Sequence, residues 1–153
     1  MQNIQQDLVK IVPYNSIYKA QLISVWEESV RATHNFLAPS DIDYYKKIVS
    51  AIDFNAFPVY CLIQNETVMG FIGVADKKIE MLFLAPTAIG QGLGKKLMRY
   101  ALEELKADKV DVNEQNDHAV LFYKKFGFVT YERMEKDSEG KNYPILKMSL
   151  AKE

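Results

Sequence analysis

Hydrophobic and polar positions follow several different periods along the chain, and each period predicts one kind of element. Apolar residues spaced three and four apart predict an amphipathic helix, whereas alternating or short continuous apolar runs predict a strand. The pattern predicts helices within 16–30, 40–52, 97–105 and 119–126, and strands at 7–12, 57–64, 67–75, 78–86, 109–112, 128–134 and 144–150. These elements follow one another in the order β-α-α-β-β-β-α-β-α-β-β. Two-residue turns are predicted at 65–66 and 76–77, Ser40 is predicted to begin the second helix, and Gly127 is predicted to end the last helix in the left-handed conformation.

This order predicts the fold class. Strands and helices interleave along 153 residues with no repeat or linker, which is typical of a single α/β (α+β) domain with a mixed central sheet over residues 1–153. We expect about seven strands and about four helices. The strand at 78–86 is almost continuously apolar, so we expect it to be covered on both faces.

Charge and composition narrow the classes of partner. The net charge is −1, with 48% hydrophobic and 25% charged residues, so we expect no binding to nucleic acid or to an anionic membrane surface. Cys61 is the only cysteine, which excludes an internal disulfide and a thiolate metal cluster, and we expect no metal site. No stretch has the pattern of a signal peptide or a membrane span, so we expect a cytoplasmic protein, either a monomer or a homodimer.

One short stretch breaks the local rules of helix formation. In IGQGLGKKL (89–97), three alternate glycines separate an apolar strand from a helix, and lysines occupy the first helical turn. Free N–H groups at a helix start carry a partial positive charge, which disfavours cations but binds anions. The glycine spacing fits neither a P-loop nor a dinucleotide-binding fingerprint. We therefore predict an anion-binding loop of another kind, and a merely tight turn is the alternative.

The glycine spacing resembles the acyl-CoA pyrophosphate loop of the GCN5-related N-acetyltransferase (GNAT) family, [RQ]-x-x-G-x-[GA]. Residues 89–94 match it, except that Ile89 stands where the family has arginine or glutamine. The resemblance implies that acetyl-CoA is the cosubstrate and that backbone N–H groups of the loop bind its pyrophosphate. It assigns to the cofactor the residues Gly90, Gln91, Gly92, Leu93, Gly94 and Lys95.

A second segment, NDHAVLFYKKFGF, resembles the other signature of the same family, N-x-x-A-x-x-x-Y-x-x-x-G-F. Its positions are occupied without a gap by Asn116, Ala119, Tyr123, Gly127 and Phe128. From the pattern alone, a helix N-cap explains Asn116 equally well, and core packing explains Tyr123. The resemblance adds cofactor contact for both, with the tyrosine hydroxyl directed at the CoA sulfur. The segments WEESVRATHNFL and GKNYPIL extend the resemblance to a narrower bacterial subgroup, the YjaB-like acetyltransferases.

The reaction that the resemblance implies is direct acetyl transfer to a primary amine. The amine could belong to a protein lysine, a protein N-terminus or a small molecule, and the subgroup favours protein lysine. Tyr123 would protonate the leaving thiolate as general acid. The strand backbone at Leu82, Phe83 and Leu84 would pair with the pantetheine arm and stabilise the carbonyl oxygen.

Two carboxylates are candidates for the base that deprotonates the amine. Glu80 leads, because strand alternation would put it on the face of Leu82 and Leu84, where burial would raise its pKa. A water-facing carboxylate is the alternative for Glu80. Asp111 is the second candidate base, because some family members carry a carboxylate there.

Two further residues are candidates for acceptor binding. His34 lies in a region resembling the acceptor-binding helices of the family and titrates near neutrality, and Tyr143 precedes Pro144 near the end of the chain. A surface or capping histidine and simple edge-strand packing are the alternatives. For the whole chain, a non-catalytic acyl-CoA-binding regulatory module is the second hypothesis, and the presence of Tyr123 favours the enzyme.

Overall fold

The computed structural model describes residues 8–151 and contains one seven-stranded sheet with four α-helices. The elements are β1 (Lys10–Pro13), α1 (Lys19–Thr33), α2 (Pro39–Ser50), β2 (Val59–Gln64), β3 (Thr67–Ala75), β4 (Lys78–Leu84), α3 (Leu93–Glu103), β5 (Lys109–Asn113), α4 (Asp117–Lys125), β6 (Phe128–Met134) and β7 (Ile145–Leu150). Short 3₁₀ turns precede α1 and follow β4. The predicted order and the mixed α/β class are confirmed. The start of the predicted first strand, residue 7, lies outside the described residues.

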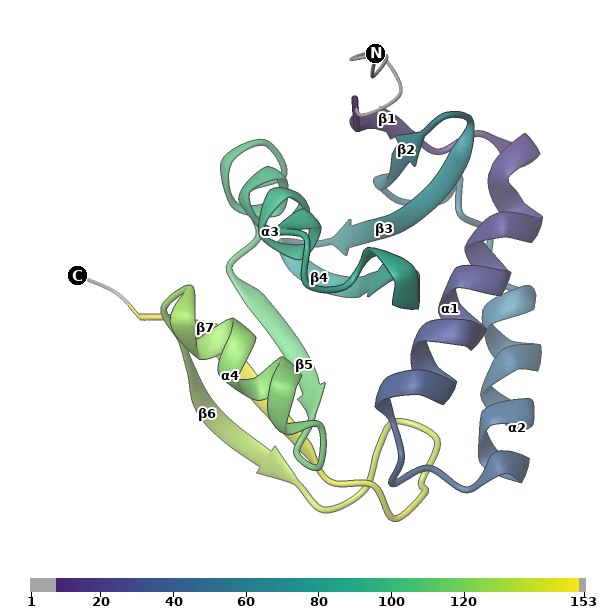
Figure 1. The fold of residues 1–153 in the computed structure, drawn as a ribbon. Coiled ribbons are helices and arrows are strands. Elements are labelled where there is room, and N and C mark those ends of the chain that lie inside the picture. Colours follow the sequence, from purple (N-terminus) through teal and green to yellow (C-terminus); the bar gives the residue numbers. More distant parts are fainter. Residues whose placement is uncertain (1–7, 152–153) are drawn as a thin grey trace.

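The sheet separates the helices into two layers. Its strand order is β1-β2-β3-β4-β5-β7-β6, and every neighbouring pair is antiparallel except β4 and β5. Helices α1 and α2 cover one face of the β1–β4 half, whereas α3 and α4 pack on the opposite face (Figure 1). Each layer encloses its own buried cluster, one around Leu22, Trp26 and Phe71 and the other around Leu97, Met98 and Met148. The two faces of the sheet are therefore covered by different helix layers.

Tight turns join β2 to β3 and β3 to β4. Both central residues of each turn have positive φ, at 51° and 64° for Asn65 and Glu66 and at 51° and 65° for Asp76 and Lys77. Such turns match the right-handed twist of antiparallel strands, which keeps the three strands in tight register. Both two-residue turns were predicted. Gly127 ends α4 with φ 97°, as predicted for a left-handed helix end.

A β-bulge interrupts β4 at Glu80. Gly73 pairs with Met81 and Val74 pairs with Ile79, which leaves Glu80 without a partner in the register. The bulge breaks side-chain alternation, because Ile79 packs in the cluster under α3 while Met81 packs in the cluster under α1. Beyond it, Leu82, Phe83 and Leu84 are only half-buried. Leu82 and Leu84 pack against one buried cluster and Phe83 packs against the other, so both faces are covered as expected, although the cover is incomplete.

The parallel pair β4–β5 separates after two residues. Lys78 pairs with Lys109 and Ile79 pairs with Val110, and no further register connects these strands. Beyond Ile79, β4 continues beside β3 while β5 diverges toward β7 (Figure 1). An interior strand thereby acquires an edge that no neighbouring strand covers, and this edge opens into a cleft.

Gly70 holds the second half of β4 close to β3. A Cβ atom at this position would lie 2.8 Å from the Phe83 carbonyl oxygen and 2.7 Å from Leu84 Cδ2. The backbone oxygen cannot move without disturbing the strand pairing. Only glycine fits here.

We expect Gly70→Ala to lower the free energy of unfolding by about 1–3 kcal/mol, the usual cost of overpacking. Gly94→Ala is the matched control, because its added Cβ would meet nothing closer than 3.4 Å and would lie in a helix. That control should be neutral or gain up to about 1 kcal/mol. Urea denaturation of both variants measures the difference, and equal stabilities would contradict the close approach at Gly70.

Candidate active site

A cleft of about 660 Å³ occupies the space where β4 and β5 diverge. Its floor is formed by the two strands, one wall by the end of α1 and the segment after it, and the other wall by α4 and the glycine loop. The lining includes Ser29, Ala32, Thr33, His34, Asn35, residues 79–84, Ile89, Gly94, residues 110–113, Asn116, His118, Ala119, Phe122 and Tyr123. The cleft thus collects side chains from four elements that are far apart in sequence.

The backbone of β4 presents hydrogen-bonding groups to this cleft. The Ala85 N–H donates to the Met69 carbonyl on β3, and successive residues of a strand point their backbone groups to opposite sides. The backbone groups of Leu84 and Leu82 therefore face the side from which β5 has diverged. An extended molecule bearing amide groups could pair with them as a strand would. The family resemblance had implied this role for the backbone at 82–84, but the backbone of Phe83 faces β3, as that of Ala85 does.

The glycine loop closes one end of the cleft. Gly90 and Gly92 have φ of 87° and 79°, and a Cβ atom added at either would meet nothing within 4 Å. Gly92 is the N-cap of α3, so the N–H groups of the first helical turn, at Leu93, Gly94 and Lys95, lack carbonyl partners within the helix. Gln91 Nε2 donates to the Thr87 carbonyl at 2.7 Å, which fastens the loop from within.

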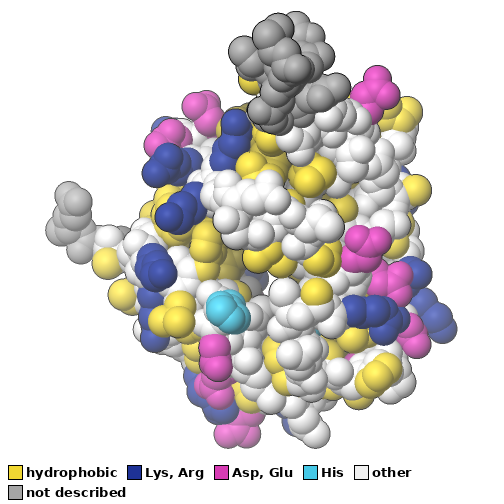
Figure 2. Space-filling model, viewed as in Figure 1, with side chains coloured by type: hydrophobic (Ala, Val, Ile, Leu, Met, Phe, Trp, Pro, Cys, Tyr) yellow, Lys and Arg dark blue, Asp and Glu magenta, His cyan; other side chains and the backbone are white. Residues whose placement is uncertain are grey.

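Exposed cations surround this loop. Figure 2 shows Lys and Arg side chains gathered over α3 and α4 at one edge of the molecule. They are the exposed side chains of Lys95, Lys96 and Arg99 on α3 and of Lys124 and Lys125 on α4. Lys96 Nζ also donates to the Val9 carbonyl at 3.3 Å. Open backbone, free N–H groups and nearby cations are features that suit an anion. Ile89, at the position of the family's arginine or glutamine, is 49% exposed and lines the cleft.

Helix α4 contributes Asn116 and Tyr123 to the cleft. Asn116 Oδ1 accepts a hydrogen bond from the Ala119 N–H at 3.2 Å, so the predicted N-cap is confirmed.

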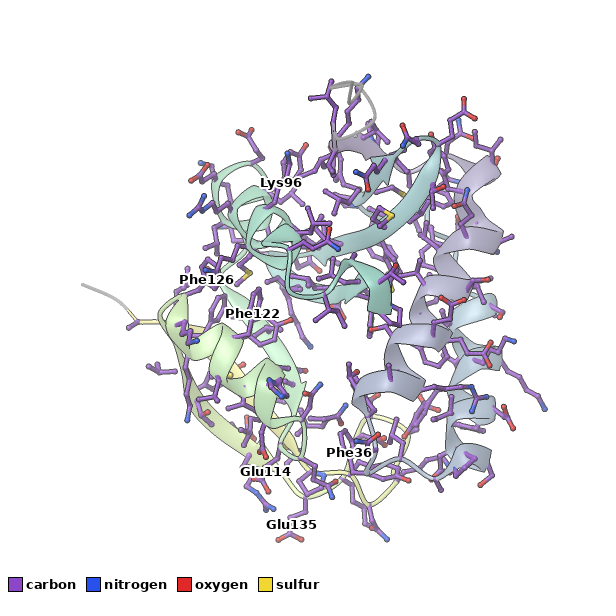
Figure 3. The ribbon with its side chains drawn as sticks, in the orientation of Figure 1. Phe36, Lys96, Glu114, Phe122, Phe126 and Glu135 are labelled. Atoms are coloured by element: carbon purple, nitrogen blue, oxygen red, sulfur yellow. The ribbon has the colours of Figure 1, made fainter. Side chains whose placement is uncertain are left out.

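Tyr123 lies seven residues after Asn116 in α4 and is 7% exposed, and its ring is edge-on to those of Phe122 and Phe128. Burial raises the pKa of the Tyr123 hydroxyl well above its ordinary value near 10. The hydroxyl is therefore protonated at neutral pH and can donate its proton. Figure 3 shows Phe122 and Phe126 on the side of α4 that faces α3.

The two candidate bases occupy different environments. Glu80 lines the cleft but is exposed, so the predicted burial on the face of Leu82 and Leu84 is wrong. The bulge explains the error, because it turns Glu80 out of the regular alternation. Asp111 also lines the cleft, but its Oδ2 lies 2.6 Å from Lys78 Nζ. This ion pair connects β4 to β5 at the point where their pairing ends, and the lysine compensates the negative charge of Asp111.

His34 follows the last residue of α1 and lies half-buried in the cleft wall. Its Nδ1 is 2.8 Å from Thr33 Oγ1, and its Nε2 is 3.5 Å from Asn116 Nδ2 across the cleft. Burial lowers the pKa of His34 to about 4, so the ring is uncharged at neutral pH. The expectation of a histidine that titrates near neutrality is wrong. Thr33 and Asn116 are 83 positions apart in the chain, and pattern analysis had no means of joining them.

Tyr143 is not among the residues that line the cleft. Its hydroxyl accepts the Ala38 N–H at 3.2 Å and donates to Asp41, and its ring packs edge-on against Phe36. Figure 3 shows Phe36 between the end of α1 and the loop that joins β6 to β7. Further links from this loop to α2 are Tyr45–Asp137, Tyr44–Glu139 and Lys141–Asp41. Tyr143 therefore fastens the outer wall of the cleft, and acceptor contact at this residue stays a prediction.

Several lining residues were missed by the sequence analysis. Ser29 was read only as part of an amphipathic helix, Thr33 fell beyond its predicted end at residue 30, and His118 was not singled out. A helical face that ends in small and polar residues, next to His34, was the available signal. Within residues 8–151, no three His, Cys, Asp or Glu side chains are grouped closely enough to hold a metal ion. None of the helices in that range is long and apolar enough to cross a bilayer.

Comparison with known proteins identifies the family. The model of the acetyltransferase (GNAT) domain matches residues 23–152. The peptidyl-lysine N-acetyltransferase YjaB of Salmonella typhimurium is 37% identical over 128 residues, which are 84% of this chain and 88% of that protein. YjaB of Escherichia coli is 34% identical over 130 residues, with the same coverage of both chains.

Solved structures agree with the sequence relatives. The solution structure of apo YjaB from Escherichia coli has a TM-score of 0.84 at 30% identity and covers 93% of this chain and 97% of that one. The structure of yncA from Salmonella typhimurium with its cofactor acetyl-CoA has a TM-score of 0.67 at 18% identity, over 95% and 96% of the two chains, and shares the fold. The resemblance drawn from the two motifs is confirmed, and the chain belongs to the GNAT family of acetyltransferases.

Proposed function

We propose that this acetyltransferase moves an acetyl group from acetyl-CoA to the side-chain amine of a lysine in a protein or peptide. The observation that carries the proposal is the uncovered β4 edge, which lies between an anion-binding loop and a buried tyrosine. The residues fit the cofactor, because the Leu82 and Leu84 backbone suits the amides of a pantetheine arm. The open backbone at Gly90 and Gly92 suits a pyrophosphate.

Acetyl-CoA supplies an acetyl group that is already activated as a thioester. The chain supplies binding, orientation and proton transfer around it. The Leu82 N–H faces the cleft, where it can donate to the thioester oxygen as that atom gains negative charge. Tyr123 can donate its proton to the departing sulfur, and the second proton that the amine nitrogen loses on acylation can return to Tyr123 through solvent. Asn116 Nδ2 is free to donate a second hydrogen toward the cofactor arm, since an amide nitrogen carries two.

Glu80 is the proposed base. A lysine amine has an ordinary pKa near 10.4, so it arrives protonated and must lose a proton before it can attack. Glu80 is exposed to the cleft, where it can take that proton directly or through water, and its negative charge attracts the ammonium group. Asp111 is less suited because Lys78 already holds it.

The lysine acceptor is supported by two arguments. The relatives at 34–37% identity are named peptidyl-lysine N-acetyltransferases. The cleft also combines apolar walls at Ala32, Ile79 and Met81 with the carboxylate of Glu80, which suits an alkyl chain that ends in a cation. Acetylation of lysine peptides by the purified protein, followed by mass spectrometry, tests the proposal. Transfer to small polyamines or peptide N-termini but not to lysine would overturn it.

We expect Tyr123→Phe to lower kcat roughly 10- to 1,000-fold, because it removes the proton donor while the ring keeps its packing. Acetyl-CoA affinity, measured by calorimetry, should change little. Tyr131→Phe is the control for loss of an exposed hydroxyl, since Tyr131 is 55% exposed on β6. Undiminished turnover in Tyr123→Phe would remove this residue from the mechanism.

Gly92→Glu should abolish acetyl-CoA binding, because a carboxylate would project into the anion site from a residue with φ 79°. Gly140→Glu is a close control, since Gly140 has φ 76° and equally open surroundings but lies in the β6–β7 loop. Both variants carry the same strain and the same added charge. If both bind acetyl-CoA equally well, the loop assignment is wrong.

Replacing each carboxylate in turn separates the two candidate bases. Glu80→Gln should lower kcat/KM for the lysine peptide by about 100-fold or more, the usual contribution of a general base. Asp111→Asn should have a smaller kinetic effect and should chiefly loosen the contact with Lys78. Steady-state rates over a range of pH provide the measurement. A larger loss in Asp111→Asn would reverse the assignment.

A further inference from the structure

The hydrogen bonds of Thr33 determine which nitrogen of His34 carries the hydrogen. Thr33 Oγ1 donates its single hydrogen to the Ser29 carbonyl, one helical turn earlier, at 2.7 Å. The hydroxyl oxygen then has only lone pairs to offer to His34 Nδ1, 2.8 Å away. Nδ1 must therefore carry a hydrogen and donate it to Thr33.

Asn116 leads to the same tautomer from the opposite wall of the cleft. Its Oδ1 accepts from the Ala119 N–H, which turns the Nδ2 group toward His34 Nε2. An amide NH₂ group only donates, so Nε2 must offer a lone pair. Two separate networks, one at the end of α1 and one at the start of α4, thus require the same tautomer.

The lone pair of Nε2 is poorly satisfied. The contact with Asn116 is 3.5 Å long, whereas N–H donors in proteins usually approach to about 2.9–3.0 Å. His34 remains uncharged at neutral pH because burial lowers its pKa to about 4. The cleft wall therefore presents an oriented, uncharged hydrogen-bond acceptor that can take a better donor.

We propose that His34 Nε2 accepts an N–H of the acceptor amine and so directs the amine lone pair toward the thioester. This inference rests on the proposed function and specifies the acceptor site. His34 takes no proton in this step; the N–H bond stays intact, and the proton lost from the ammonium goes to Glu80. The amine replaces the long contact with Asn116, whose Oδ1 stays engaged as the cap of α4.

The neighbours of His34 limit the kind of amine that fits. Ala32 and Met81 line the cleft with apolar surface, and Glu80 offers the negative charge. Because His34 Nε2 accepts a hydrogen bond, it favours a nitrogen that carries hydrogens. Because the ring is uncharged, His34 does not repel a cationic amine. The site therefore takes an unbranched primary alkylamine, as in a lysine side chain, in preference to a tertiary amine.

Four variants of the full-length protein separate the acceptor contact from mere packing. His34→Leu removes the acceptor atom and should raise the KM for a lysine peptide roughly 3- to 30-fold, as expected for one lost hydrogen bond. His34→Gln places an amide oxygen near the position of Nε2 and should recover most of that loss. Thr33→Val removes only the hydroxyl that orients the ring and should raise the same KM, whereas Thr33→Ser should restore it.

The readouts distinguish failure of this inference from failure of the proposed function. Acetyl-CoA affinity, measured by calorimetry, should stay within about twofold of wild type in all four variants. Ring nitrogen shifts from NMR at pH 7 should show hydrogen on Nδ1 in the wild type and a mixture of tautomers in Thr33→Val. A ring protonated on Nε2, or an unchanged acceptor KM in His34→Leu, would overturn the inference. A loss of acetyl-CoA affinity in His34→Leu as large as the rise in its KM for the lysine peptide would also overturn the inference. Absence of wild-type turnover on lysine would instead overturn the proposed function, and the NMR measurement would still judge the tautomer.

Discussion

The separation of β4 from β5 is the constraint on which the rest of the structure depends. Hydrogen bonding between parallel strands normally continues along their shared length, but here it stops after Ile79. A buried strand edge without partners costs free energy unless something else satisfies its polar groups. The cleft solves this by exposing the edge at Leu82 and Leu84 to whatever occupies it. The bulge at Glu80 and the glycine at position 70 both serve this arrangement.

The elements themselves could be predicted because their signals are local. Periodicity located the four helices, the two-residue turns located the β2–β3–β4 meander, and Gly127 marked the end of α4. The glycine loop was predictable for the same reason, since a left-handed backbone at Gly90 and Gly92 leaves its mark on the residues that form it. The start of α2 was less certain: Ser40 looked like the beginning, yet Pro39 is the first helical residue.

Features that join distant parts of the chain were not predictable from these patterns. Strand alternation put Glu80 on a buried face, because a bulge depends on the pairing with β3 and not on the residues of β4. The ion pair of Asp111 with Lys78 depends on which strands become neighbours. His34 and Asn116 lie 82 residues apart, and only the folded sheet brings α1 and α4 to opposite walls of one cleft. The two signature motifs were informative because each is contained in one continuous segment.

The divided sheet also has a mechanical consequence. Its two parts, β1–β4 with α1 and α2 and β5–β7–β6 with α4, are joined within the sheet by two residue pairs and by the Lys78–Asp111 contact. Apart from this junction, the two parts share the buried cluster around Leu97, Met98 and Met148 beneath α3, where no strand pairing connects them. A ligand that lies along β4 and reaches α4 bridges both parts, and it stabilises the folded chain in proportion to RT ln(1 + [L]/Kd). In the binding mode proposed above, the cosubstrate would connect the two parts, and the free energy of unfolding would rise with the concentration of the molecule that the enzyme consumes.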